Sequence, residues 1–294
     1  MKPTWAKRQV EIFLTQFAIR SEGYCRGPPW LQLRQLWTVR TMPNRAADSQ
    51  SSRHSLSDWL ALHELDPLTC RRILDAMALE NAAPRSDDQL EEYQIIDPEV
   101  AWLRAVEAMR DFLPEQQRIV DDTFENSAKI VVDDPDKPRK ALTLDNGSGA
   151  YPTIVYSYRS KPIDELTIAH EFAHAVQIVA SQGRFVPPIV REICAFLGEG
   201  ALLSHAGRRH RTQYTHLVQA WDKANHRHFG VLKEGLQAAL SSSDMPYKYA
   251  WNYPIARYLA LQISDQCSQD CIWSIFQGKS SLKDVLRELR FPQS

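Results

Sequence analysis

The sequence predicts a mainly α-helical protein with a small β-sheet, in which a H-E-x-x-H motif lies on a buried helix. Apolar residues recur at helical spacing over most of the 294-residue chain, and only two short runs are rich in β-branched and aromatic residues. The motif lies in a long, mostly apolar stretch that no proline or glycine interrupts. With 44% hydrophobic and 24% charged residues, the chain can bury a substantial core.

The charge and hydropathy of the chain argue against several classes of protein. Lys and Arg total 35 and Asp and Glu total 36, and this net charge of −1 disfavours a nucleic-acid partner or a polybasic membrane binder. The mean hydropathy is −0.40, and no apolar run approaches the roughly 18 residues of a membrane span. The amino terminus lacks the continuous apolar centre of a secretory signal, so we expect a cytoplasmic protein with no membrane partner. The five scattered cysteines favour reduced thiols, and the Cys267–Cys271 spacing is only a weak metal-site pattern.

Residues 1–130 are predicted to form a helical flanking region. Helical periodicity indicates helices over residues 5–20 and 29–39, and a polar loop follows over residues 42–57. A short helix is then expected to start at Ser57.

Two Asp-Pro pairs mark further helix starts in this flanking region. Asp66 and Asp97 are each expected to be an N-cap, because a proline follows each of them at the first helical position. These helices should run to about Glu80 and Phe112. The proline that follows Leu113 ends the second helix, and another helix should then run to about residue 126.

The remaining residues, 131–294, are predicted to carry the functional site. Residues 141–144 and 153–158 favour strands, and an Asn-Gly-Ser-Gly turn separates them. From Asp164, a suitable N-cap, the chain is predicted to be helical to its end. We expect both regions to form one compact unit.

Residues 170–174 read His-Glu-Phe-Ala-His, a H-E-x-x-H motif. Positions i and i+4 lie on one face of a helix, so the imidazoles of His170 and His174 can reach one metal ion. Glu171 lies one residue round the helix, where its carboxylate can reach water at the metal rather than the metal itself. Two histidines at the solvent edge of a helix are the alternative, but the flanking residues are mostly apolar and buried imidazoles need partners. The motif therefore predicts one Zn²⁺ per chain.

A third ligand is expected on the next predicted helix, because a catalytic zinc usually has three protein ligands and one open position. Glu192 and Glu199 interrupt an apolar stretch and, seven residues apart, lie on one helix face. We assign Glu192 as the third metal ligand, because its distance from His174 leaves room for a turn and an antiparallel return. Glu199 is assigned to orient a histidine ligand or to contact an arginine. The reverse assignment of the two glutamates stays open.

Three blocks of the sequence resemble the thimet oligopeptidase and oligoendopeptidase F family of zinc metallopeptidases. Residues 149–158 and 164–174 look like the family's Gly-Ala-aromatic strand, short loop and Thr-Leu-Ala-His-Glu segment. Residues 192–203 look like its Glu-Ile-Ala-Ser…Glu-Ala-Leu-Leu helix, and residues 247–251 resemble its Tyr-x-Tyr-x-aromatic loop. The resemblance covers about residues 145–265. It implies a zincin-like core of the gluzincin type, reduced in size.

The resemblance also implies an activity. Residues 131–294 would form a zincin-like catalytic region of a metallopeptidase, either an endopeptidase or an oligopeptidase, that acts on a peptide or a dedicated protein substrate. Glu171 would deprotonate water at the zinc, and the resulting hydroxide would attack a peptide carbonyl. Tyr249 is our first candidate for stabilising the oxyanion, followed by Tyr247 and Tyr253. Packing in an aromatic core is the alternative role for each tyrosine.

In the family an edge strand precedes the zinc helix. The resemblance therefore implies that residues 153–158 form an exposed edge that pairs with an extended peptide. Ile154, Val155 and Tyr156 would then bind the substrate, and Tyr253 is a further candidate contact.

The chain also departs from the family. Ala173 replaces a usual Gly, Gln177 replaces a frequent His, and residues 239–244 lack the Tyr and His that normally help to stabilise the oxyanion. Two alternatives therefore stay open: a non-catalytic binding or regulatory protein on a zincin scaffold, and an effector or toxin-type protease with one protein target. The histidines and arginines of residues 205–228 favour a solvated cationic helix pair, with His226 or His228 as the alternative anion donor at the site.

Overall fold

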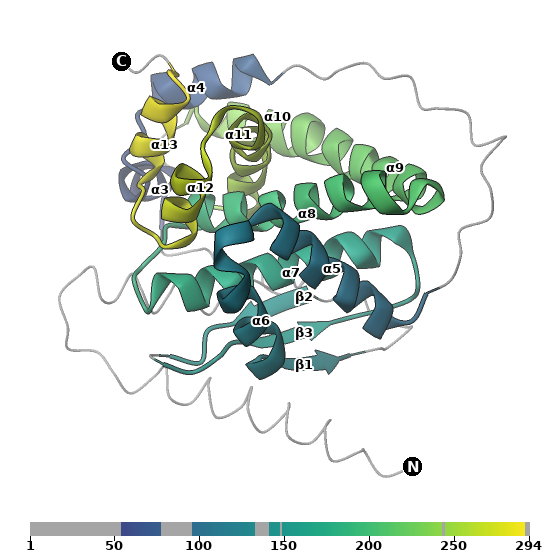
Figure 1. The fold of residues 1–294 in the computed structure, drawn as a ribbon. Helices are drawn as coiled ribbons and strands as arrows, with labels where there is room; N and C mark the ends of the chain where they lie inside the picture. Colours follow the sequence, from purple (N-terminus) through teal and green to yellow (C-terminus); the bar gives the residue numbers. More distant parts are fainter. Residues whose placement is uncertain (1–53, 78–95, 133–140, 148, 243–244, 292–294) are drawn as a thin grey trace, which may run out of the picture. The chain divides into compact units, whose positions relative to one another are not determined.

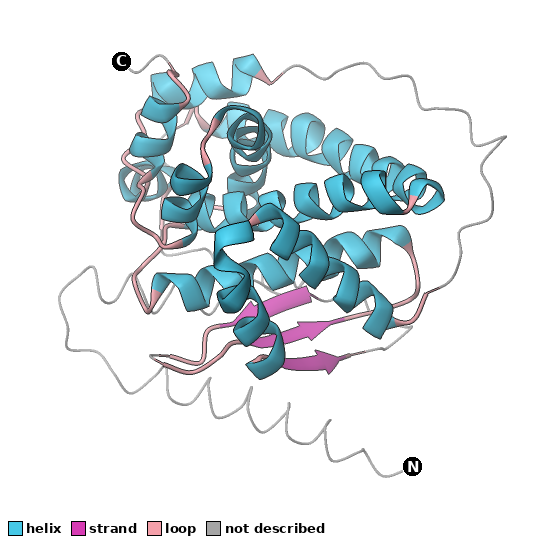
Figure 2. Ribbon diagram, viewed as in Figure 1, coloured by secondary structure: helices cyan, strands magenta, loops and turns pink. Residues whose placement is uncertain are grey.

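The structure is a computed structural model that describes residues 54–77, 96–132, 141–147, 149–242 and 245–291. All of them lie in the unit formed by residues 42–294. This unit is mainly helical and contains one three-stranded sheet (Figures 1 and 2). The predicted fold class, mainly α with a small β-sheet, is confirmed. The helices predicted over residues 5–20 and 29–39, and most of the polar loop after them, lie outside the described residues. The division at residue 130 stays a prediction.

Among the described residues, four helices precede the first strand, and local capping marks several of their starts. They are α3 (Leu56–Leu62), α4 (Pro67–Ala76), α5 (Pro98–Phe112) and α6 (Gln117–Asn126), with the 3-10 turn η3 (Pro114–Gln116) between the last two. The predicted helix starts after Asp66 and Asp97 are confirmed, and the Asp66 carboxylate accepts the backbone N–H of Thr69 at 2.9 Å. Helix α3 begins before the predicted Ser57, because Ser55 and Asp58 form a capping box.

The sheet has the strand order β1-β3-β2, with β1 (Ala128–Val131), β2 (Ala141–Leu144) and β3 (Thr153–Tyr156). Strand β3 pairs with β1 in parallel and with β2 in antiparallel fashion. The sequence predicted β2 and β3 and missed β1. Strand β2 lies beside helix α7 (Pro162–Ser181), and Figure 1 shows α7 between the sheet and helix α8 (Pro188–Arg209).

The expectation that residues 153–158 form an exposed edge is wrong. Strand β3 is the central strand, so both of its edges already carry backbone hydrogen bonds. Ile154, Val155 and Tyr156 are buried. The Tyr156 hydroxyl accepts a hydrogen bond from the indole N–H of Trp102 at 2.8 Å, which makes its ring part of the core. The free edge next to α7 belongs to β2 among the described strands.

Helices α7 and α8 pack closely because small residues face one another. A Cβ atom at Gly198 would lie 2.5 Å from the Cβ of Ala173 and 2.8 Å from the carbonyl oxygen of Ala169. Only glycine fits at such a distance. Helix α7 begins two residues before Asp164, which is not the N-cap as predicted; its carboxylate accepts the backbone N–H of Lys161 at 2.9 Å from within the first turn.

The described part of the remaining chain is mainly helical, as predicted. It comprises α9 (Arg211–Arg227), the π-helical segment η4 (His228–Leu232), α10 (Lys233–Ala239), the 3-10 turn η5 (Tyr249–Trp251), α11 (Asn252–Gln266), α12 (Gln269–Phe276) and α13 (Leu282–Glu288). Helix α11 packs against α8, opposite the position of the sheet (Figure 1). Among the described helices, none is long and apolar enough to cross a membrane. The cytoplasmic location stays a prediction.

Candidate metal centre

Two histidines of α7 and one glutamate of α8 converge. Ligand atoms of His170, His174 and Glu192 all lie within 4.8 Å of one another. The Nε2 atom of His170 is 3.3 Å from Oε2 of Glu192, and Nε2 of His174 is 3.7 Å from Oε1 of the same carboxylate. One helical turn separates the two histidines, and the glycine-mediated contact between the helices brings the carboxylate to them. Together, these three side chains form a group that could bind a metal ion.

The surroundings of Glu192 fit a cation. This side chain is only 2% exposed, and its Oε2 atom has no hydrogen-bond partner among the described residues. Burial raises the pKa of Glu192, but the charge of His174 and the nearby ring of His170 outweigh burial and hold the pKa well below its usual range. An ionised, buried carboxylate oxygen without a donor is costly, and a metal ion would satisfy it.

Glu199 holds His170 from the side opposite Glu192. The Nδ1 atom of His170 lies 2.7 Å from Oε1 of Glu199, a hydrogen bond in which the ring N–H donates. This contact leaves the Nε2 atom of the ring facing Glu192. Burial lowers the pKa of His170, but Glu192 and Glu199 outweigh burial and raise the pKa to about 10. The metal-free site therefore holds a proton where a cation would bind.

A buried arginine from α11 completes this side of the site. Arg257 is 0% exposed and donates from Nη1 to Oε2 of Glu199 at 2.5 Å. Its Nε donates to Oδ1 of Asn225 at 2.7 Å, and its guanidinium lies 3.5 Å from the ring centre of Trp221 and 4.8 Å from that of Phe196. Sequence reasoning allowed for an arginine at Glu199 but did not identify Arg257, because nothing in a lone arginine in a helix indicates burial.

Glu171 lies beside the metal group and is held by the sheet. The Thr143 hydroxyl, on strand β2, lies 2.7 Å from Oε2 of Glu171 and 2.9 Å from the backbone oxygen of the same residue. Glu171 is 6% exposed. Thr143 therefore links strand β2 to the carboxylate of Glu171. A threonine in a predicted strand does not indicate this role from the sequence.

Three tyrosines from the segment 247–253 approach the metal group. The Tyr249 hydroxyl donates to Oε1 of Glu192 at 2.5 Å, and the Tyr247 hydroxyl accepts from Nδ2 of Asn252 at 2.6 Å. The Tyr253 ring packs 5.8 Å from the Tyr249 ring, and its hydroxyl has no hydrogen-bond partner among the described residues. Burial, followed by the charges of Glu192 and Glu171, raises the pKa of Tyr253.

Of the two histidines considered as anion donors, only His228 lies near this cluster. His226 is exposed. The His228 ring packs 5.3 Å from the Phe196 ring and 5.7 Å from the Tyr253 ring, at the start of the π-helical segment. Burial lowers the pKa of His228 to about 3, so the ring is neutral. It has no positive charge to offer an anion.

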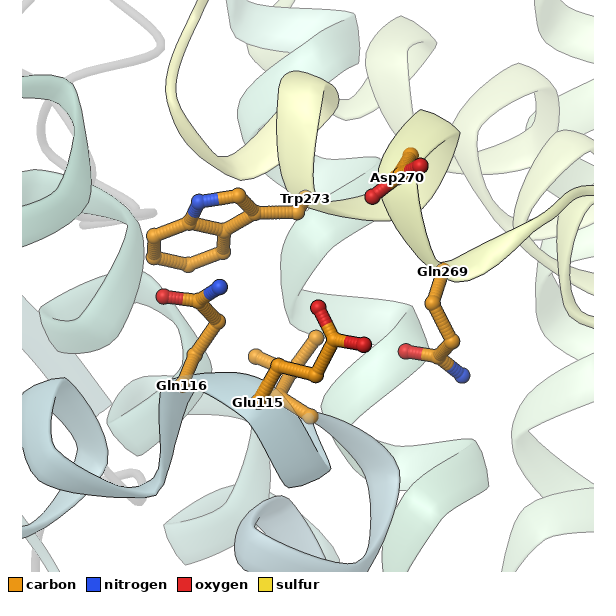
Figure 3. A pocket seen from close by; sticks show the side chains of 6 residues that line it. Glu115, Gln116, Gln269, Asp270 and Trp273 are labelled. Carbon is orange, nitrogen blue, oxygen red and sulfur yellow. The ribbon is translucent and has the colours of Figure 1, made fainter.

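A small surface pocket lies apart from these residues in the sequence (Figure 3). None of its lining residues belongs to the metal group, and they come from η3, the residue before it and α12. They are Leu113, Glu115, Gln116, Gln269, Asp270 and Trp273. The pocket contains no set of metal-ligating side chains.

Comparisons with known proteins give a similarity to a solved structure at low sequence identity. No protein-family model matches the chain, and no curated protein matches it. Among solved structures, the chain is similar to a crystal structure described as "a putative oligoendopeptidase F" from Bacillus anthracis strain Ames, with 13% sequence identity and a TM-score of 0.49. The match covers 98% of this chain and 60% of that one. The chain therefore spans about three fifths of the length of that protein.

Proposed function

We propose that the protein is a zinc metallopeptidase that hydrolyses peptide bonds. The observation that carries this proposal is the convergence of His170, His174 and Glu192 within 4.8 Å, with Glu171 next to His170 on the same helix. Two imidazole nitrogens and one carboxylate oxygen are a donor set that suits zinc, and three protein ligands leave a position open for chemistry. Bound zinc would polarise a carbonyl group and lower the pKa of water.

Glu171 is the general base of the proposed reaction. Its carboxylate lies on α7 beside the ligand histidines, and Thr143 holds one carboxylate oxygen, which leaves the other oxygen for water. Glu171 would accept a proton from water and later donate it to the leaving amine. A buried carboxylate that is held at one oxygen needs little reorganisation for these transfers.

We assign different roles to Tyr253 and Tyr249 near the metal. Tyr249 uses its hydroxyl to hold Glu192, whereas the Tyr253 hydroxyl has no such partner among the described residues. We therefore assign the hydrogen bond to the oxyanion first to Tyr253 and second to Tyr249. This order reverses the preference that the family resemblance implied.

Strand β2 supports a peptide as the substrate class. Its free edge lies beside α7, and its residue Thr143 contacts the proposed general base. An extended peptide that pairs with β2 would place a scissile bond near Glu171, and its affinity would come from main-chain hydrogen bonds. This assignment moves the substrate strand from β3, where the sequence placed it, to β2.

Metal analysis and one substitution test the proposal. We expect about one zinc per chain, and we expect Glu171→Gln to retain the zinc while kcat on a quenched peptide library falls on the order of 10²–10⁴-fold. The matched control is Glu165→Gln, which alters another buried glutamate of the same helix outside the metal group and should leave most of the activity. Full hydrolysis by Glu171→Gln, or a protein without bound zinc, would refute the proposal.

A further inference from the structure

We propose that Asn252 is a positioning residue for the tyrosines of the site, and that Trp59 of helix α3 holds it in place. The inference rests on the proposed function only in saying what the tyrosines do. It gives residues of the amino-terminal flanking region a role at the site, although Trp59 and Asn252 are 193 positions apart in the sequence.

Asn252 uses its whole side-chain amide in this network. Its Nδ2 donates to the Tyr247 hydroxyl at 2.6 Å and to the backbone oxygen of Tyr249 at 2.8 Å. Its Oδ1 accepts from the indole N–H of Trp59 at 2.8 Å. An indole N–H can only donate and a backbone carbonyl can only accept, so the orientation of the amide is fixed by chemistry. Both Asn252 and Trp59 are 0% exposed.

The network ends at a proposed metal ligand. Asn252 fixes the backbone of Tyr249, and the hydroxyl of the same tyrosine donates to Glu192 at 2.5 Å. The Tyr253 residue follows Asn252 directly in α11, so the backbone that Asn252 anchors also carries the free hydroxyl. One buried amide therefore supports all three tyrosines.

Backbone contacts join the same two segments. The N–H of Leu56 donates to the oxygen of Met245 at 3.0 Å, and the N–H of Tyr247 donates to the oxygen of His54 at 2.9 Å. These bonds surround an isolated antiparallel bridge between Ser55 and Pro246. Residues 245–253, the tyrosine segment, are thus held at their start by strand-like pairing and near their end by the Trp59–Asn252 bond.

Aromatic packing adds to this contact. The Trp59 ring is stacked against the Tyr247 ring at 6.4 Å between centres, with an angle of 28° between the planes, and meets the Trp251 ring edge-on at 6.5 Å. Removing the indole N–H while keeping an aromatic ring would leave most of this packing but orphan Oδ1 of Asn252. A displacement of a catalytic hydroxyl by about 1 Å can cost on the order of 10²-fold in rate.

Two substitutions in the full-length chain test the proposal. Asn252→Leu removes the amide, and Trp59→Phe, the milder change, removes only the indole donor. For both we expect about one zinc per chain, a kcat lower by about ten- to a hundred-fold, and a KM close to that of the original protein. The backbone amides of residues 245–252 should exchange hydrogen faster, while those of α7 stay protected.

Trp102→Phe is the matched control. It also removes a buried indole N–H hydrogen bond of 2.8 Å, but the partner is Tyr156 in the sheet. We expect this variant to keep its kcat and the slow exchange of residues 245–252.

Two results would overturn the positioning role. One is exchange of residues 245–252 in Trp59→Phe no faster than in the Trp102→Phe control, and the other is a loss of zinc that parallels the loss of kcat. The exchange measurement needs no activity. If the original protein bound no zinc and cleaved no peptide, the proposed function would fail while the exchange data still tested the role of Asn252.

Discussion

His170 and His174 lie one turn apart on α7, yet the surroundings of their Nδ1 atoms are opposite. Nδ1 of His170 is bound by Glu199, which is bound in turn by the buried guanidinium of Arg257. Nδ1 of His174 is buried and has no hydrogen-bond partner among the described residues. The ring of His174 is thus placed by packing, including a contact of 4.9 Å between ring centres with His170. Helical spacing brings both proposed ligands to one face, but the Nδ1 atom of only one of them is oriented by a tertiary hydrogen bond.

We expect the largest effect from a substitution that removes the support of His170 and does not alter a partner of His174. Arg257→Met removes the buried cation that pairs with Glu199, so that only the His170 ring still contacts this buried carboxylate. Such losses cost on the order of 3–5 kcal/mol, so we expect the free energy of unfolding to fall by about this amount in urea titrations. Zinc affinity, measured by competition with a chromophoric chelator, should fall about 10- to 100-fold.

The double variant Arg257→Met with Glu199→Gln separates the two causes. It removes both charges of the pair, so most of the lost stability should return, while the weakened zinc binding remains. If the double variant were no more stable than Arg257→Met alone, the ion pair would not be the source of the destabilisation.

A second prediction affects both histidines equally. A Cβ atom at Gly198 would meet Ala169 and Ala173, which precede His170 and His174. Gly198→Ala must therefore push α7 and α8 apart, and overpacking of this kind costs about 1–3 kcal/mol. We expect a lower melting temperature and weaker zinc binding.

Gly200→Ala is the control for this substitution. A Cβ at Gly200 would have only one neighbour within 4 Å, an atom of Trp221 at 3.8 Å. Alanine is the better helix former, so this variant should be unchanged or more stable by about 0.5–1 kcal/mol. Equal losses at both glycines would show that helix separation is not the cause.

The third prediction concerns the shape of the pH profile of the metal-free protein. His170 has its pKa raised to about 10, against about 6.5 in an unfolded chain, so its contribution to stability is complete below pH 6.5 and is lost as the pH rises towards 10. Burial lowers the pKa of His63 and His228 to about 3, so the unfolded chain binds more protons there and stability falls as the pH drops below 6.5. We expect maximal stability near pH 6.5 in urea titrations of the chelated protein.

Zinc loading provides the control. A ligand histidine has no proton on its coordinating nitrogen, so the decline above pH 6.5 should disappear when zinc is bound. A metal-free protein whose stability stayed constant between pH 6.5 and 10 would contradict the role given to His170.

The local part of this structure was predictable from the sequence. Asp-Pro pairs, helical periodicity and the β-branched runs reflect interactions within a few residues, and they identified α4, α5, β2, β3 and the helix that carries H-E-x-x-H. The strand order could not be obtained in this way. Strand β1 is short and follows α6 directly, so the periodicity of its four residues gives no signal, and nothing in the sequence corrected the edge position that the family resemblance implied for β3.

The site shows the same limit. The positions of His170, His174 and Glu192 follow from helix geometry and one short connection, so their spacing predicted that they would converge. Arg257 and Thr143 lie on elements that are distant in the sequence from the residues they contact. The identity of an arginine or a threonine does not indicate which residue it will contact. The hydrogen bond of Tyr249 to Glu192 was likewise not predictable, because it depends on where α11 packs against α8.

The metal group and the tyrosine segment also differ in the length of the loop that must close before each can form. Helices α7 and α8, which carry the proposed metal ligands, are neighbours in the sequence, whereas the tyrosine segment pairs with residues 54–59, almost two hundred positions away. Closing a longer loop costs more conformational entropy, and the chain loses this entropy before the favourable contacts form. Under the proposed function, a folding chain would be able to bind its metal ion before the tyrosine segment docks, and the binding energy of the ion would then help to guide that docking.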